Sequence, residues 1–451
     1  MIVLARLIVL VLLNLAILAT SAQAAKNFVD IERVISPGGI EAWLVNDASV
    51  PVISFRFSFR GGASLDPVGK QGLAKMTSTL IDEGAGDLDS QAFQRRLQDL
   101  SIALRFHAGR DTFSGNMKTL SKNRDQAFDM VRLALTKPRF DDEPVSRLRA
   151  QLLSGLRRDQ EDPDAIARKT LAEMLFPNHP YGRPVGGELK SISAITADDM
   201  RGFIARRLAR DNLYVAVVGD ISAPELAGQL DRIFGALPAR ATPYAVTEVE
   251  ARADGRTRII DLDVPQSAIV FAQKGLKRKD PDFFPAFVLN HILGGGGFTS
   301  RLYDEIREKR GLAYAIYCFA SSYLDGGMFG IYAGTGEDEI TKLVPLVCDE
   351  IKKVQDQVGP QEVARAKAQL KASILMSLES SASRCEQLAR QLLVFNRPLS
   401  VEEVVGKIEA VDGPSITAVA RRIFTTAPTL ASLGPISKLE DFDGIKRRLD
   451  A

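Results

Sequence analysis

The stretch Gly294–Tyr314 reads GGGGFTSRLYDEIREKRGLAY, and the interpretation of the whole chain starts from it. It opens with four consecutive glycines, Gly294, Gly295, Gly296 and Gly297. Glycine has no Cβ atom, so another backbone can approach this loop closely and positive φ angles cost little. No Lys-Ser or Lys-Thr pair closes the loop, which argues against a nucleotide phosphate site. The glycines predict either a mobile turn after a helix or a point of close backbone approach.

A short charged helix is predicted directly after the glycines. Leu302 and Ile306 stand at i, i+4 spacing and would form its buried stripe. Thr299 or Ser300 is expected to cap its first turn, and Gly311 to end it. The chain then enters a strand.

An internal repeat extends the analysis to the rest of the chain. Asp198–Ser222 aligns without gaps on Gly413–Ser437, an offset of 215 residues, the difference between 413 and 198. Upstream, Ala150–Leu152 matches Ala368–Leu370 at an offset of 218, the difference between 368 and 150. A near-constant offset predicts duplication of a domain of about 200 residues, since solenoid repeats have periods of roughly 20 to 50.

The predicted fold class is therefore α+β, with two homologous tandem halves, each an antiparallel sheet with helices packed on one face. The boundaries are residues 25–236 for the first half and 257–451 for the second. The linker is expected at 237–256, which carries Pro238 and Pro243 and lacks apolar periodicity.

Alternation and helical spacing predict the elements of the first half. Asp89 or Ser90 is expected to cap the helix that runs through Leu97. The predicted elements are a strand hairpin over 40–60 that turns at 46–49, a helix over 71–81, a hairpin over 102–120, helices over 124–136 and 142–176 with a break at Asp162-Pro163, a helix over 197–209 and a strand over 212–218.

Composition and charge exclude several classes of protein. The 451 residues are 45% hydrophobic and 25% charged, as in ordinary globular proteins. Lys and Arg total 58 against 56 Asp and Glu, so the net charge of +2 gives no overall attraction to nucleic acid. No stretch after the N-terminus is long and apolar enough to span a bilayer, so the mature form is expected to have no membrane segment.

Residues 1–24 predict a secretory signal peptide. Arg6 precedes an apolar run, and Ala22-Gln23-Ala24 places small residues at the spacing of a cleavage site. A retained membrane anchor is the alternative, but the apolar run is short for a bilayer span. The expected cut follows Ala24, and the expected location in a bacterium with two membranes is the periplasm.

The three cysteines, Cys318, Cys348 and Cys385, form no CxxC pair. Three is an odd number, so at most one bridge can form and a disulfide framework is excluded. Buried thiols on strands and helices are expected instead.

The glycine stretch and the tandem halves together resemble the pitrilysin and insulinase family of zinc peptidases, in the branch of the mitochondrial processing peptidase. In that family an arginine and a tyrosine seven residues apart, just after a glycine-rich loop, reach into a zinc site and hydrogen-bond the substrate. Arg307 and Tyr314 match that spacing. The resemblance covers nearly all of the mature chain.

The zinc motif of the resembled family is degenerate here. The family carries H-x-x-E-H on a helix of the first half, where two histidines bind zinc and the glutamate acts as base. In this chain Lys75 and Thr79 replace the two histidines and Ser78 replaces the glutamate. The only histidines are His107, His179 and His291, none in a ligand motif, so no metal is expected in this chain.

The resemblance implies the subunit without zinc of a heterodimeric zinc metallopeptidase, inactive alone and active as a complex. The partner would be a homologous subunit that bears H-x-x-E-H and the zinc, and the substrate a peptide or unfolded polypeptide. Arg307 and Tyr314 would be the catalytic residues, and the glycine loop 294–297 would bind substrate. The alternative is a non-catalytic peptide-binding or structural core-type protein of the same fold.

Overall fold

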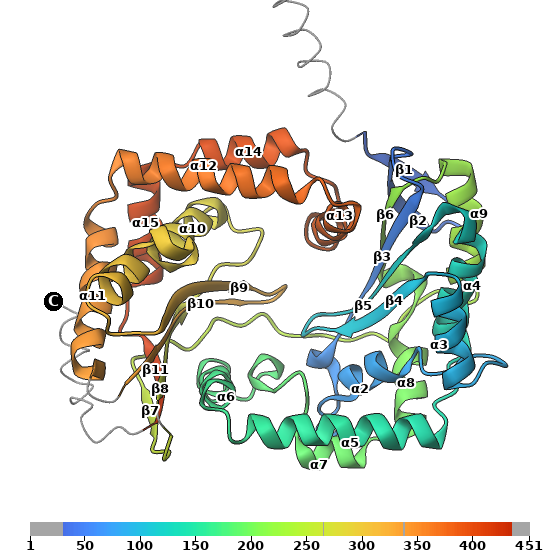
Figure 1. Cartoon of the computed structure of the whole chain (residues 1–451), viewed down its shortest axis with the longest axis horizontal. Helices are drawn as coiled ribbons and strands as arrows, with labels where there is room; N and C mark the ends of the chain where they lie inside the picture. The colour runs from blue at the N-terminus through green and yellow to red at the C-terminus, as the bar shows by residue number, and fades with distance from the viewer. Residues whose placement is uncertain (1–29, 265, 337–338, 435–451) are drawn as a thin grey trace, which may run out of the picture.

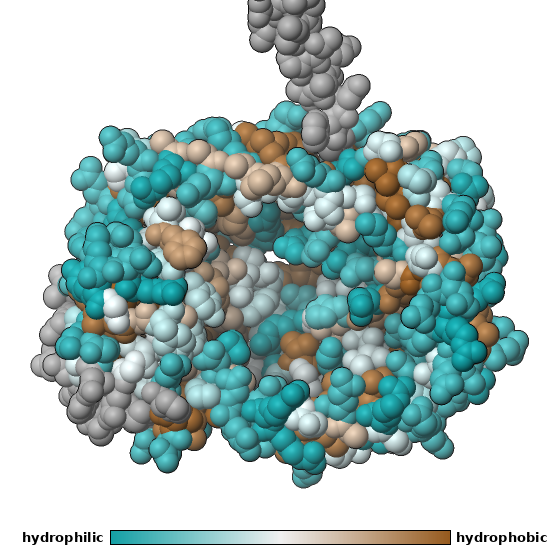
Figure 2. Space-filling view, in the orientation of Figure 1, coloured by the Kyte–Doolittle hydropathy of each residue, from teal (hydrophilic) through white to brown (hydrophobic). Residues whose placement is uncertain are grey.

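The computed structural model describes residues 30–264, 266–336 and 339–434 (Figure 1). The predicted signal peptide, and the Ile436-Ser437 end of the repeat, lie outside the described residues. The chain forms two sheet-and-helix halves that face each other (Figure 1), and the surface is hollowed between them (Figure 2). Within the described part, no helix has the length and apolar character needed to cross a bilayer.

The first half is built on a six-stranded mixed sheet in the order β1-β2-β6-β3-β5-β4. All neighbours are antiparallel except β2 and β6, which run parallel. The strands are β1 (Glu32–Ile35), β2 (Glu41–Asn46), β3 (Val52–Arg60), β4 (Ala103–Ala108), β5 (Thr112–Leu120) and β6 (Leu213–Gly219).

The hairpin predicted over residues 40–60 is wrong in its pairing, although both of its strands exist. Strand β6 lies between β2 and β3, with Trp43 opposite Ala216 and Ile53 opposite Gly219. The reason is burial: Val215, Ala216, Val217 and Val218 are all fully buried, so β6 needs a neighbour on each side and a cover on both faces. The second predicted hairpin, β4 with β5, is confirmed.

Most helices of the first half follow the sequence prediction, but those over 189–194 and 223–234 were not predicted. Asp89 caps α3 by accepting the N–H of Ala92, and Asp162 caps α6 by accepting the N–H groups of Asp164 and Ala165. The break at Asp162-Pro163 is thereby confirmed. The helices are α2 (Leu73–Leu80), α3 (Ser90–Asp99), α4 (Arg124–Thr136), α5 (Asp142–Asp159), α6 (Pro163–Leu175), α7 (Leu189–Ala194), α8 (Ala197–Arg207) and α9 (Ala223–Phe234).

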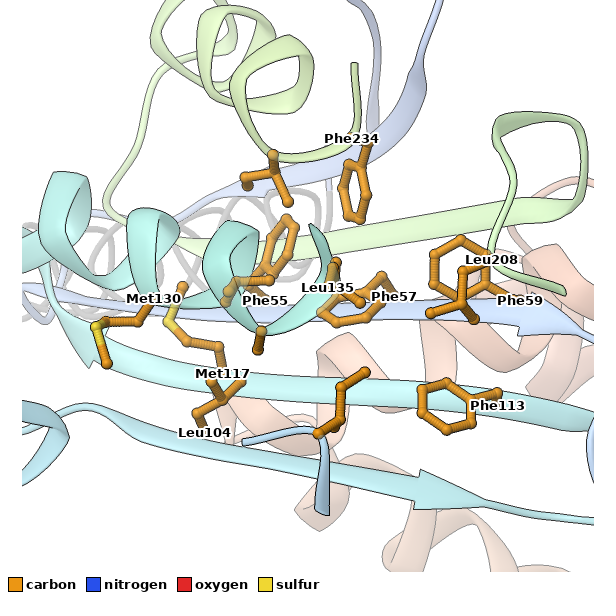
Figure 3. Packing of buried hydrophobic residues seen from close by; sticks show 14 of the residues in the cluster. Phe55, Phe57, Phe59, Leu104, Phe113, Met117, Met130, Leu135, Leu208 and Phe234 are labelled. Carbon is orange, nitrogen blue, oxygen red and sulfur yellow. The ribbon is translucent and has the colours of Figure 1, made fainter. Parts of the chain in front are cut away.

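Three phenylalanines of β3 anchor the core between this sheet and its helices. Phe55, Phe57 and Phe59 alternate with polar residues along the strand, so all three point to the helix-covered face (Figure 3). Phe234 of α9 packs against them, with its ring centroid 5.5 Å from that of Phe57. Across the sheet, Gly115 leaves room for the Phe57 ring, which a Cβ atom would approach to 2.1 Å.

The second half repeats the first. Its five-stranded sheet has the order β7-β11-β8-β10-β9, with β7 and β11 as the parallel pair. Helix α15 and strand β11 repeat α8 and β6, so the α+β class with two similar halves is confirmed, while the exact boundaries at 236 and 257 remain predictions. The elements are β7 (Thr257–Ile260), β8 (Ser267–Lys274), β9 (Ala315–Ser322), β10 (Gly327–Thr335), β11 (Thr429–Leu433), α10 (Phe283–Asn290), α11 (Ile340–Asp356), α12 (Pro360–Ser377), α13 (Ser381–Phe395), α14 (Val401–Glu409) and α15 (Gly413–Ile423).

The halves exchange one helix each. Most helices of a half cover one face of its own sheet, as predicted, but the opposite face is covered by a helix from the other half (Figure 1). Leu171 and Leu175 of α6 pack on β8 and β11, and Leu388 and Leu392 of α13 pack on β2 and β6. Each half therefore buries one sheet face of the other.

Polar contacts and one thiol reinforce the exchange. Arg384 of α13 is ion-paired with Asp47 at the end of β2, at 2.5 Å. The Sγ atom of Cys385 donates to the carbonyl of Ala216 at 3.1 Å. Cys318, Cys348 and Cys385 are all buried, on β9, α11 and α13, as predicted.

Candidate functional site

The glycine loop is packed against strand β9. Helix α10 continues as a π-helical turn over His291–Gly295, and the loop closes in a 3₁₀ turn over Gly297–Thr299. A Cβ atom on Gly294 would lie 2.5 Å from the backbone nitrogen of Cys318. Gly297 has a φ of +62°, and within the described part of the chain such an atom would have no neighbour within 4 Å. The first glycine is thus required for packing and the fourth for backbone conformation.

We expect Gly294→Ala to lower the free energy of unfolding by about 2 kcal/mol, because the added methyl overlaps backbone that cannot rotate away. Gly336→Ala is the matched control, since its Cβ would meet none of the described residues within 4 Å and its φ is not positive. Urea denaturation of both variants measures the difference. Equal stability of the two would contradict the close packing of the loop on β9.

The helix after the loop is confirmed, with one correction. Leu302 and Ile306 are fully buried. Gly311 ends the helix with a φ of +64° and an N–H that donates to the carbonyl of Arg307. The predicted side-chain cap is not formed: the hydroxyls of Thr299 and Ser300 instead donate to the carbonyls of Gly296 and Gly297, at 3.3 and 2.7 Å.

Arg307 is held in place by an aromatic pair. Its Nη1 donates to the hydroxyl of Tyr303, and its guanidinium carbon lies 4.7 Å from the centroid of the Tyr303 ring. The ring of Phe298, from the glycine loop, meets Tyr303 edge to face at 4.9 Å. In the described part of the chain, Arg307 makes no ion pair, and its side chain is exposed. Its charge is therefore positioned but not compensated.

Tyr314 is positioned by both halves of the chain. Its ring lies across Gly334 of β10, where a Cβ atom would approach its hydroxyl to 2.4 Å. The Tyr314 hydroxyl is hydrogen-bonded to that of Tyr332, which donates to Asp164 at the start of α6 at 2.5 Å. Burial and these contacts raise the pKa of Tyr332. Tyr314 itself is 46% exposed, so its phenol is oriented and accessible.

The structure connects the predicted residues in two groups. Arg307 joins the glycine loop through Tyr303 and Phe298, while Tyr314 joins β10 and α6. Among the described residues, no hydrogen bond links the Arg307 and Tyr314 side chains. Tyr332, Asp164 and Gly334 had no signal in the sequence, because they reach Tyr314 from distant segments, whereas Tyr303 stands one helical turn before Arg307.

The residues of helix α2 do not fit a zinc ion. Ser78 and Thr79 both donate their hydroxyls to the carbonyl of Lys75, at 2.8 and 3.0 Å. Both hydroxyls are therefore engaged within their own helix and do not form a set of ligands around one metal position. Burial and the positive charges of Lys75 and Arg56 lower the pKa of His107, the nearest histidine. Over residues 30–264, 266–336 and 339–434 there is no group of three or more His, Cys, Asp or Glu able to hold a metal ion.

The other two histidines are engaged elsewhere. His179 accepts the N–H of Tyr181 at 3.1 Å, and its other nitrogen lies 3.0 Å from the carbonyl of Thr247. The Nε2 atom of His291 lies 2.9 Å from the amide oxygen of Gln369. Both therefore serve the structure of loops and helix ends.

A large cavity between the halves was not foreseen from the sequence. Its volume is about 1220 Å³, and residues of both halves line it, including Arg60, Arg110 and Arg278. The basic run Lys277-Arg278-Lys279 was the available signal, but its position between β8 and α10 gave no sign of what it faces.

Comparison with known proteins yields a consistent set of relatives. Residues 194–370 match the family described as peptidase M16 inactive domain. An uncharacterized zinc protease of Streptomyces coelicolor is 31% identical over 327 residues, 71% of each chain. The probable mitochondrial-processing peptidase subunit beta of Arabidopsis thaliana is 24% identical over 424 residues, 91% of this chain and 80% of that protein. The crystal structure of a peptidase M16 inactive domain from Pseudomonas fluorescens superposes with a TM-score of 0.85 at 26% identity, over 92% of this chain and 100% of that one.

Proposed function

This chain belongs to the M16 family of zinc peptidases, the pitrilysin and insulinase family, and we propose that it is the non-zinc subunit of a heterodimeric peptidase. In this proposal it pairs with a homologous subunit that carries H-x-x-E-H. It supplies Arg307 and Tyr314 to the active site of that partner. The substrates are peptides or unfolded polypeptides, and the location is the periplasm, which the signal-peptide pattern of residues 1–24 supports.

One observation carries the proposal: this chain lacks the residues of the zinc motif but keeps the arginine and tyrosine of the expected site. The positions of the two zinc-binding histidines hold Lys75 and Thr79, and the position of the base holds Ser78; the hydroxyls of Ser78 and Thr79 donate to the Lys75 carbonyl of their own helix. Arg307 and Tyr314, in contrast, are accessible and supported by neighbours. An exposed guanidinium without a carboxylate partner is poised to bind an anion or a carbonyl oxygen.

The chemistry assigned to this chain is hydrogen-bond donation. Arg307 and Tyr314 would donate to a substrate carbonyl, or to the oxyanion that forms when water attacks it. Preorganised donors of this kind stabilise a transition state by about 3 kcal/mol each. The Gly294–Gly297 loop, where Gly297 has open space around it, would admit an extended peptide backbone. The zinc and the general base belong to the partner.

Reconstitution tests the proposal. Hydrolysis of an unfolded polypeptide is measured with this chain alone, with a coexpressed family member bearing H-x-x-E-H, and with the mixture, and zinc is counted in each. We expect activity in the mixture only, and zinc only in the partner. A Glu→Gln change in the partner's motif is the control and abolishes activity. No gain on mixing would refute the proposal in favour of the peptide-binding or structural alternative.

A further inference from the structure

The cavity between the halves is separate from the Arg307 and Tyr314 groups. It lies between helices α10, α13 and α14 of the second half and the ends of β3 and of the β4–β5 turn in the first. Neither Arg307, Tyr314 nor any residue of the glycine loop lines it. Its volume of about 1220 Å³ exceeds the roughly 300–1,000 Å³ typical of small-molecule sites, so it has room for several residues of a peptide.

The wall of the cavity carries an excess of positive charge. Seven Lys and Arg residues line it, against three acidic residues, Asp111, Asp325 and Glu402. Three of the seven are paired with carboxylates outside the cavity wall: Lys277 with Glu248, Arg384 with Asp47 and Arg390 with Glu386. The other four, Arg60, Arg110, Arg278 and Lys279, have no ion pair among the described residues.

Arg278 is the most distinctive of these cations. Its guanidinium carbon lies 3.9 Å from the ring centroid of Phe283 and 5.8 Å from that of Phe284. Burial, with a smaller contribution from Arg390, lowers the pKa of Arg278 to about 10. Arg278 is half-buried at the cavity wall, and among the described residues no carboxylate or hydrogen-bond acceptor pairs with its guanidinium, so its charge is open to an anion in the cavity.

Arg110, from the first half, lines the same cavity and is held by two carbonyls and a ring. It donates to the carbonyls of Tyr181 and Arg183, the latter at 2.9 Å, and its guanidinium carbon lies 5.5 Å from the Tyr323 ring centroid. Asp111 next to it is already used, since it accepts from the Tyr181 hydroxyl at 2.7 Å and from the N–H of Leu324 at 2.9 Å. The carboxylate of Asp111 is therefore engaged in hydrogen bonds that stabilise the fold.

Apolar side chains supply the rest of the surface near Arg278. Phe283, Phe287 and Leu276 line the cavity from α10 and from the end of β8. A cation set among aromatic and aliphatic side chains matches a carboxylate attached to an apolar group. A phosphate would require more donors and less apolar wall.

We propose that this cavity binds the C-terminal carboxylate of a peptide whose last residues are apolar, with Arg278 as the residue that pairs with the carboxylate. The proposal deepens the proposed function, on which it rests for the peptide nature of the ligand. It makes this chain a subunit that holds one end of the substrate at a site of its own. Free apolar acids share the same chemistry and are separated from peptides in the test below.

The test is direct binding to this chain alone. A fluorescein-labelled decapeptide that ends in Leu-Phe is titrated by anisotropy, once with a free C-terminal carboxylate and once as the C-terminal amide. We expect the free acid to bind at least about tenfold more tightly, because the amide cannot form a charge-assisted pair with a guanidinium. N-acetyl-phenylalanine is then added as a competitor. If displacing the labelled peptide takes a competitor concentration more than about 100-fold above that of the peptide, the site prefers peptides to free apolar acids.

Variants locate the effect. Arg278→Gln is expected to remove the difference between acid and amide, and Arg278→Lys to keep part of it. Arg95→Gln is the matched control, an exposed arginine on α3 that is remote from the cavity wall. Equal affinity of acid and amide for the wild-type chain, or an unchanged difference in Arg278→Gln, would overturn the proposal. Because no partner is present, this result is independent of whether reconstitution yields activity.

Discussion

The Arg307→Ala variant is expected to lower the kcat of the reconstituted peptidase by about 100-fold, the loss typical of a single oxyanion donor. Arg307 has no ion pair in the described part of the chain, so its removal should leave the fold intact. Tyr314→Phe is expected to act in the same direction while it keeps the ring across Gly334. Steady-state kinetics, together with gel filtration of the complex, measure rate and assembly separately.

The matched control for Arg307 is Arg310→Ala. Arg310 belongs to the same exposed turn but is paired with Glu305 at 2.6 Å, so it is not available to a substrate. We expect its loss to change kcat by less than about twofold. A normal rate in Arg307→Ala, or an equal loss in Arg310→Ala, would remove the role assigned to Arg307.

The second large effect concerns the exchanged helix α13. Leu388→Asp is expected to lower the free energy of unfolding by more than about 4 kcal/mol, because it puts an unpaired charge against a fully buried sheet face. Leu171→Asp in α6 should act in the same way on the other sheet. Urea unfolding followed by far-UV circular dichroism measures both.

The control is Leu375→Asp on α12, where the same change is made at a side chain that is 51% exposed. We expect its stability to stay within about 0.5 kcal/mol of wild type. If Leu388→Asp were as stable as Leu375→Asp, α13 would not provide the cover of the first sheet, and the reciprocal exchange would be wrong.

The elements of the fold were largely predictable, since local spacing encodes them. The range predicted for α4, 124–136, is the range observed, and the break between α5 and α6 follows from Asp162-Pro163. The repeat of α8 and β6 in α15 and β11 was visible as matching letters. In each case, residues close in sequence carry the information.

Pairing and exchange were not predictable from local patterns. Alternation shows that residues 41–46 and 52–60 are strands, but the strand between them comes from residues 213–219. Likewise, Cys385, Leu388, Ala389 and Leu392 form an ordinary apolar stripe on α13. Nothing in such a stripe says which of two similar sheets it will cover.

In the candidate site, too, some residues were predictable from local sequence and others were not. Arg307 and Tyr314 were found by their spacing after a glycine run. Tyr303, which orients Arg307, lies only one helical turn away, but Tyr332 and Asp164, which orient Tyr314, meet only in the folded chain. Arg278 had a visible basic run, but its significance comes from Phe283 and from the cavity, neither of which a charge pattern reveals.

The helix exchange also has a consequence for how the protein is made. Every strand of the first sheet has been synthesised by Gly219, yet the helix that covers its inner face begins at Ser381. At roughly 5–20 residues per second, a ribosome needs about 10 to 30 s to cover that interval. Throughout it the nascent chain exposes Val45, Ala216 and Val218, a flat apolar surface prone to aggregation. We therefore expect a fragment of the chain that ends before α13 to aggregate more readily than the full chain.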